Sequence, residues 1–105
     1  MELDPIRTVF WDAFRHLFPV HAKAAQTATG SLVITWSIKS DPQARFPYAT
    51  PITVRFDDEL AQALEGAAPQ EWLQLAQRQE AALRAGMVGY DPFAAVPKAR
   101  VIVLG

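Results

Sequence analysis

The stretch LVITWSIK at residues 32–39 carries the clearest structural signal in the chain. Its apolar side chains alternate with Thr35, Ser37 and Lys39. A period of two residues is that of a β-strand with one buried and one solvated face. The stretch therefore predicts a strand whose polar side chains face solvent.

A second stretch, TPITVRF at residues 50–56, shows the same alternation, with Thr53 and Arg55 on the polar side. The segment between the two strands contains Asp41-Pro42, which is typical of turns. We therefore predict an antiparallel hairpin with a long polar loop.

Helical signals lie on both sides of this hairpin. Asp4 and Pro5 are suited to the N-cap and the first position of a helix over residues 5–18, which Pro19 ends. Downstream, Asp57 or Asp58 is expected to cap a short acidic helix over residues 59–65, and Pro69 begins a longer one that runs to about residue 85.

Two further strands complete the predicted fold. Residues 20–29 are rich in alanine but also alternate, and we favour a strand there; residues 100–104, RVIVL, form a last strand rich in valine and isoleucine. We predict a single α+β domain over residues 1–105. Its antiparallel sheet of three to four strands has helices on one face, in the order α-(β)-β-β-α-α-β, where brackets mark the ambiguous strand.

The composition indicates the compartment. The chain has no cysteine, no secretory signal pattern and no long apolar run, so we expect a cytoplasmic protein without a membrane segment. Arginine outnumbers lysine seven to three and asparagine is absent, which suggests the coding bias of a GC-rich bacterial genome.

No pattern of residues predicts catalysis or a cofactor. The serines lie in no G-x-S-x-G context, and neither a Walker A nor a Rossmann glycine pattern occurs. His16 and His21 lack the spacing that places two imidazoles on one helical face, and helix capping accounts for the acidic residues at 57–59. We therefore expect no catalytic residues, no metal site and no cofactor.

The order of elements resembles that of type II KH domains and of double-stranded RNA-binding domains. A KH domain clamps nucleic acid with a GxxG loop, whereas the corresponding turn here is GAAP at residues 66–69, between Glu65 and Glu71. A double-stranded RNA-binding domain has lysines at the start of its last helix, whereas the helix after the hairpin here opens with the acidic residues at 57–59. The resemblance therefore leaves nucleic-acid binding as an alternative function.

The aromatic residues favour a different function. Six of them have no obvious buried position in the predicted fold: Trp11, Phe18, Phe46, Tyr48, Tyr90 and Phe93. Exposed aromatic clusters commonly mark interfaces, although some of these rings are expected to cover the ends of the core. We predict a non-enzymatic protein-association module, a homodimer or a subunit of a complex, with Trp11, Phe18, Tyr90 and Phe93 at its interface.

Charge is distributed unevenly along the sequence. Residues 13–56 carry five Lys and Arg against one Asp, whereas residues 57–80 carry six Asp and Glu against one Arg. Such asymmetry indicates either an anion-binding face or mutual neutralisation within or between molecules. With an anion-binding face, the polar sheet face binds RNA, single-stranded DNA or another anion through Lys39, Arg45 and Arg55. A separate alternative is a small-molecule pocket formed by loops and lined by His21, Asp41, Arg45 and Asp91.

Overall fold

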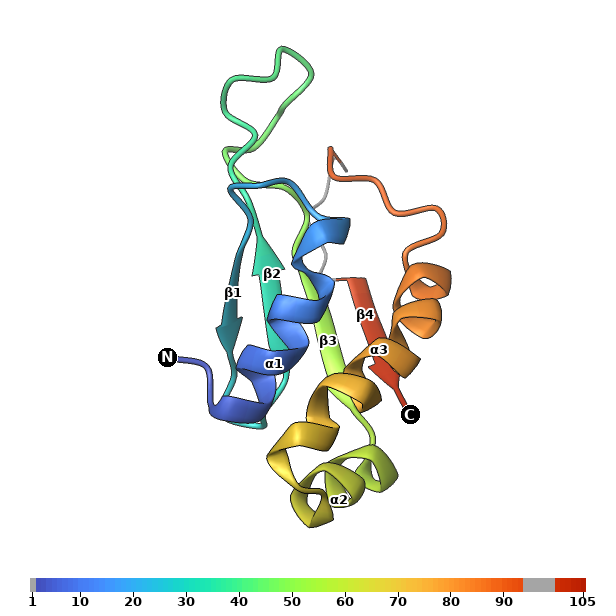
Figure 1. The fold of residues 1–105 in the computed structure, drawn as a ribbon. Helices are drawn as coiled ribbons and strands as arrows, with labels where there is room; N and C mark the ends of the chain where they lie inside the picture. Colours follow the sequence, from blue (N-terminus) through green and yellow to red (C-terminus); the bar gives the residue numbers. More distant parts are fainter. Residues whose placement is uncertain (1, 94–99) are drawn as a thin grey trace.

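The computed structural model describes residues 2–93 and 100–105, which form a four-stranded sheet with helices on one face (Figure 1). This arrangement confirms the predicted α+β class. The elements in chain order are α1 (Pro5–Phe14), a short 3₁₀ helix η1 (Arg15–Leu17), β1 (Lys23–Gln26), β2 (Leu32–Thr35), β3 (Ile52–Phe56), α2 (Asp58–Gly66), α3 (Pro69–Gly86) and β4 (Arg100–Leu104).

The sheet is mixed, with the strands in the order β1-β2-β3-β4. The first three strands are antiparallel neighbours, so the hairpin and the strand within residues 20–29 are confirmed. β4 runs parallel to β3, and the expectation of an antiparallel sheet is wrong there. The reason lies in the connection, because α2 and α3 carry the chain back to the end of the sheet at which β3 begins.

The predicted helix starts are confirmed by their caps. The Asp4 side chain accepts the N–H of Arg7, and the Asp57 side chain accepts the N–H of Leu60. The first helix ends four residues earlier than predicted, at Phe14, and continues as η1. Phe18, which precedes Pro19, is extended, as the proline ring requires of its neighbour.

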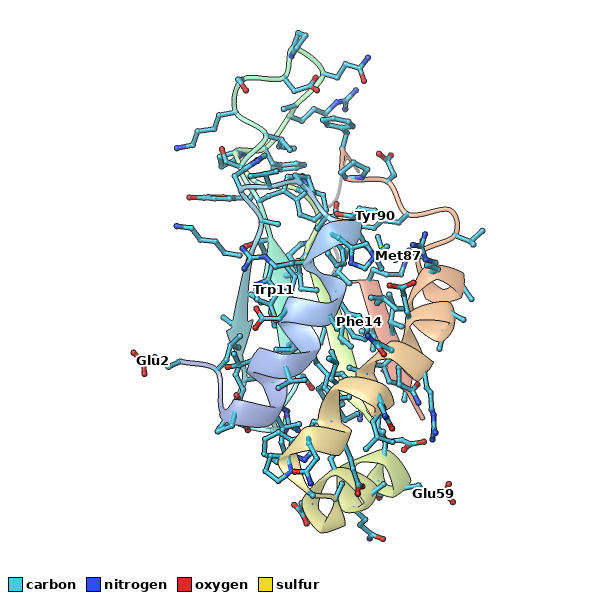
Figure 2. All side chains as sticks on the ribbon, viewed as in Figure 1. Glu2, Trp11, Phe14, Glu59, Met87 and Tyr90 are labelled. Carbon is cyan, nitrogen blue, oxygen red and sulfur yellow. The ribbon has the colours of Figure 1, made fainter. Side chains whose placement is uncertain are left out.

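The core lies between the helices and the inner face of the sheet. Phe10 and Phe14 of α1 are fully buried, and α1 packs against α3. The ring of Phe10 meets those of Phe14 and Phe56 edge to face, at centroid distances of 5.7 and 5.0 Å. Figure 2 shows Phe14 beside α1, while Glu2 and Glu59 extend away from the body of the protein. Aromatic packing therefore joins α1 to the end of β3.

α3 approaches the sheet closely at Gly86. A Cβ atom at this position would lie 2.7 Å from Cγ2 and 2.9 Å from Cγ1 of Ile102 in β4. Real Cβ contacts are longer, so the absence of a side chain allows the end of α3 to rest on β4. Arg100 strengthens this junction, because its guanidinium donates to the carbonyls of Gly86 and Val88 at 3.3 Å.

This contact predicts opposite outcomes for two glycine substitutions in helices. Gly86→Ala is expected to lower the free energy of unfolding by about 1–3 kcal/mol through overpacking against Ile102. Gly66→Ala, where a Cβ meets nothing within 4 Å, is expected to be neutral or stabilising by up to about 1 kcal/mol. Urea denaturation measures both, and equal stabilities would contradict the account.

Candidate functional site

The face of the sheet opposite the helices presents eight outward side chains, which we call the open face: Lys23, Ala25, Val33, Thr35, Thr53, Arg55, Val101 and Val103. Their sequence neighbours, such as Ile34, Val54 and Ile102, are buried on the helix side. The strand register aligns Ala25, Val33, Thr53 and Val101 in one row across all four strands. This row is uncharged, and the open face is therefore partly apolar.

Charge is segregated between the sheet and the rest of the protein. None of the four strands contains an aspartate or glutamate, and all eleven acidic residues lie in helices, caps or loops. Lys23 and Arg55 flank the uncharged row on the open face. The open face is consequently basic at its margins.

β4 forms one edge of the sheet, and none of the described strands pairs with its outer side, which we call the free edge. The backbone groups of β4 alternate between β3 and this free edge. The N–H of Arg100 donates to the Pro51 carbonyl at 2.8 Å, and the Leu104 carbonyl accepts from Asp57 at 2.9 Å. With this register, alternate residues of β4 bond to β3. The N–H and carbonyl groups of Val101 and Val103 therefore point away from β3, and the two residues are 52% and 55% exposed.

Two of the four aromatic residues expected at an interface lie in the core. Trp11 and Phe18 are 8% and 7% exposed, so the expectation that they lack a buried position is wrong. Their rings are 5.8 Å apart, and the series continues through Trp36 to Tyr90 in steps of 6.1 Å. Tyr90 and Phe93 are half-buried. The aromatic series thus closes one end of the core.

Tyr90 joins this series to the β3 side of the sheet. Its hydroxyl donates a hydrogen bond to the Thr50 carbonyl. Burial is the main cause that raises the pKa of Tyr90 to about 12; Asp91 raises it further and Arg100 lowers it. The residue therefore holds the loop after α3 against the start of β3 as a neutral phenol.

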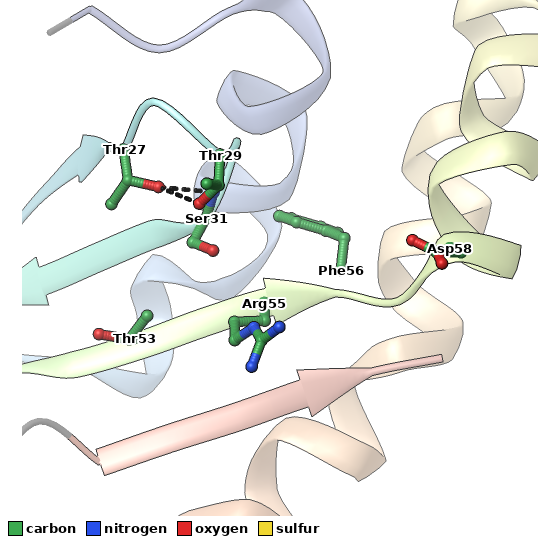
Figure 3. A pocket seen from close by; sticks show the side chains of 7 residues that line it. All are labelled: Thr27, Thr29, Ser31, Thr53, Arg55, Phe56 and Asp58. Carbon is green, nitrogen blue, oxygen red and sulfur yellow. Dashed lines mark hydrogen bonds between the residues drawn. The ribbon is translucent and has the colours of Figure 1, made fainter.

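The three basic residues expected to contact an anion do not lie together. Lys39 and Arg45 belong to the long β2–β3 loop, where the Lys39 ammonium lies 5.9 Å from the centroid of the Tyr48 ring. Arg55 lies at the other end of β3. There it lines a hollow of about 420 Å³ together with hydroxyl-bearing residues of the β1–β2 loop (Figure 3).

The loop residues expected to line a small-molecule pocket are also separate. His21 lines a hollow of about 370 Å³ with Lys23, Thr35, Trp36, Ser37 and Tyr48. Asp41 and Asp91 instead accept the N–H groups of Gln43 and Phe93, as turn-forming residues do. Sequence reasoning did not find either hollow, because each combines side chains of neighbouring strands or loops with no sequence motif.

Comparison with known protein families, curated protein sequences and solved structures finds no match. Among the residues that the structure describes, no helix is long and apolar enough to cross a membrane. Within the same residues, no three histidine, aspartate or glutamate side chains gather closely enough to hold a metal ion.

The raised pKa of Tyr90 predicts a pH-dependent stability. An unfolded tyrosine has a pKa of about 10, so the neutral phenol is favoured in the folded state. Its contribution is complete below about pH 10 and is lost as the pH rises through about 12. Tyr90→Phe is expected to lower the free energy of unfolding at neutral pH by about 0.5–1.5 kcal/mol, and to lose less stability between pH 10 and 12.

Urea denaturation of both proteins at a series of pH values measures this difference. Parallel losses of stability in the wild type and in Tyr90→Phe above about pH 10 would contradict the assignment.

Proposed function

We propose that this protein is a non-enzymatic association module that forms a homodimer through the free edge of β4. The observation that carries the proposal is the outward orientation of the backbone groups of Val101 and Val103 at the end of the sheet. An edge of this kind is a template for another strand. The same residues expose their side chains on the open face, so the edge offers both hydrogen bonds and apolar surface.

A second copy of β4 fits this edge by symmetry. When two β4 strands lie antiparallel about a two-fold axis at Ile102, Val101 is opposite Val103 of the partner subunit, and the converse pair forms as well. Both residues direct their N–H and carbonyl groups outward, so each pair exchanges two hydrogen bonds. The identical patch on both subunits makes this a closed, isologous interface.

The side chains favour the same pairing. Val101, Ile102, Val103 and Leu104 carry no charge, and no proline interrupts the strand. In the dimer the valines of both copies lie side by side on the open face, and Val103 of the partner subunit extends the uncharged row of Ala25, Val33, Thr53 and Val101 by one apolar residue. Cross-strand pairs of β-branched side chains stabilise a sheet.

The opposite edge is less suited to association. β1 carries Lys23 on the open face, and charged residues on edge strands discourage pairing, whereas the charged residue of β4, Arg100, directs its guanidinium to the carbonyls of Gly86 and Val88. The side chain of Gln26 on this strand is also engaged, because it accepts the N–H of Asp4 at 2.8 Å and donates to its carboxylate at 3.1 Å. The proposal therefore assigns association to β4 alone.

Nucleic-acid binding has less support from the geometry. Sheets that bind single strands present aromatic rings on which bases stack. The outward strand positions of the open face hold alanine, valine, threonine, lysine and arginine, but no aromatic residue. Tyr48, which is 54% exposed, lies in the long loop instead.

Charge substitutions in β4 test the pairing directly. The variants V101K/V103K and V101E/V103E each place like charges opposite one another, and each is expected to raise the dimer dissociation constant by about tenfold or more. An equimolar mixture of the two is expected to form a heterodimer, because every facing pair then has opposite charges. Light scattering coupled to size exclusion measures each state.

Val103→Thr serves as the matched control, since it keeps the backbone donor and the branched shape and should leave the dimer intact. Thermal unfolding of each variant checks that the fold is retained. A wild type that stays monomeric at high concentration, or double variants that dimerise as well as the wild type does, would overturn the proposal.

A further inference from the structure

The hollow at Arg55 lies where β3 ends and the β1–β2 loop turns. Seven residues line it: Thr27, Thr29, Ser31, Thr53, Arg55, Phe56 and Asp58. Figure 3 shows Thr27, Thr29 and Ser31 grouped on one side and Asp58, at the start of α2, on the other. One guanidinium, four hydroxyl groups and one carboxylate thus share a small space that does not involve the β4 edge.

The loop that carries three of these hydroxyl groups is held in place by its own hydrogen bonds. The N–H of Thr27 donates to the Ser31 carbonyl, and the N–H of Ser31 donates to the Thr27 hydroxyl. Gly30 turns the chain with a φ of +84°, a conformation that favours glycine. Arg7 anchors the Gly30 carbonyl to α1 at 2.8 Å. The hydroxyl groups are therefore positioned before any ligand arrives.

The hydrogen-bonding capacity of these groups is only partly used inside the protein. The hydroxyls of Thr27 and Thr29 pair at 3.0 Å. Among the described residues, no hydrogen bond engages the hydroxyls of Ser31 or Thr53, and no ion pair or hydrogen bond engages the guanidinium of Arg55. By contrast, Arg7 bonds both Asp4 and Gly30 and lies over the Phe56 ring. The hollow consequently presents a surplus of donors.

We infer that the Arg55 hollow binds the phosphate group of a small molecule. A guanidinium with neighbouring hydroxyl donors matches the geometry and charge of a phosphate. The Asp58 carboxylate restricts which anions can bind in the hollow, because it repels an anion unless that anion carries a proton to donate. Hydrogen phosphate and the protonated form of a phosphate monoester have such a proton, whereas sulfate has none near neutral pH.

The size of the hollow favours a phosphate with a substituent. Its volume of about 420 Å³ exceeds what one inorganic phosphate fills. Phe56 contributes an apolar part of the lining. Inorganic phosphate and glycerol 3-phosphate therefore distinguish binding of free phosphate from binding of a phosphate that carries a substituent. Glycerol 3-phosphate is expected to bind more tightly.

Titration calorimetry at pH 6, where phosphate monoesters are partly protonated, tests the inference with inorganic phosphate, glycerol 3-phosphate and sulfate as probes. Both phosphates are expected to bind at least about tenfold more tightly than sulfate. Arg55→Gln is expected to weaken phosphate binding by about tenfold or more, which corresponds to the loss of one charge-assisted contact. Arg78→Gln, an exposed arginine of α3, is the matched control and should bind as the wild type does.

Asp58→Asn tests the role of the proton. The variant is expected to bind sulfate and phosphate with affinities within about threefold of each other, because an amide donates to either anion. Thermal unfolding verifies that each variant is folded. Absence of phosphate binding by the wild type, equal loss in Arg55→Gln and Arg78→Gln, or unchanged discrimination in Asp58→Asn would overturn the inference.

Discussion

The parallel pairing of β3 with β4 is the constraint on which the rest of this structure depends. A parallel partner requires a crossover, and α2 and α3 provide it on the face that α1 also covers. Gly86 and Ile102 set the distance at which this crossover rests on the sheet. Parallel strands are usually covered on both faces. The β3–β4 pair is unusual because one of its faces is uncovered, and valine side chains are exposed there. The exposed valines of β4 and the free edge are both consequences of this one pairing.

Much of the fold is predictable from the sequence, because burial of one face imposes a period of two on β2 and β3, and the N-caps at Asp4 and Asp57 mark where helices begin. The direction of β4 does not follow from these patterns. The sequence feature that indicates it is the length of the two helices before β4, which suits a parallel crossover and which the prediction of an antiparallel sheet did not take into account. The burial of Phe18 is not visible on a helical wheel, since the chain tightens into η1 and is extended at Phe18. The ring of Phe18 then lies 5.8 Å from that of Trp11, a contact that a wheel does not show either.

The candidate site is likewise only partly predictable from the sequence. Arg55 is recognisable as an outward residue from strand alternation alone, but its neighbours Thr27 and Thr29 reach it only through the β1–β2 turn. Lys39 and Arg45 are positively charged like Arg55, but they lie in the β2–β3 loop and not at this site. The structure thus separates three surfaces with different chemistry: an apolar edge at β4, a donor-rich hollow at Arg55 and an aromatic end of the core that Tyr90 closes.

Amide hydrogen exchange of β4, measured at several protein concentrations, tests the central claim most directly. The N–H of Ile102 points toward β3 and should be protected at every concentration, whereas those of Val101 and Val103 should become protected as the concentration rises. Fast exchange of both valine amides at all concentrations, beside a protected Ile102, would contradict the account.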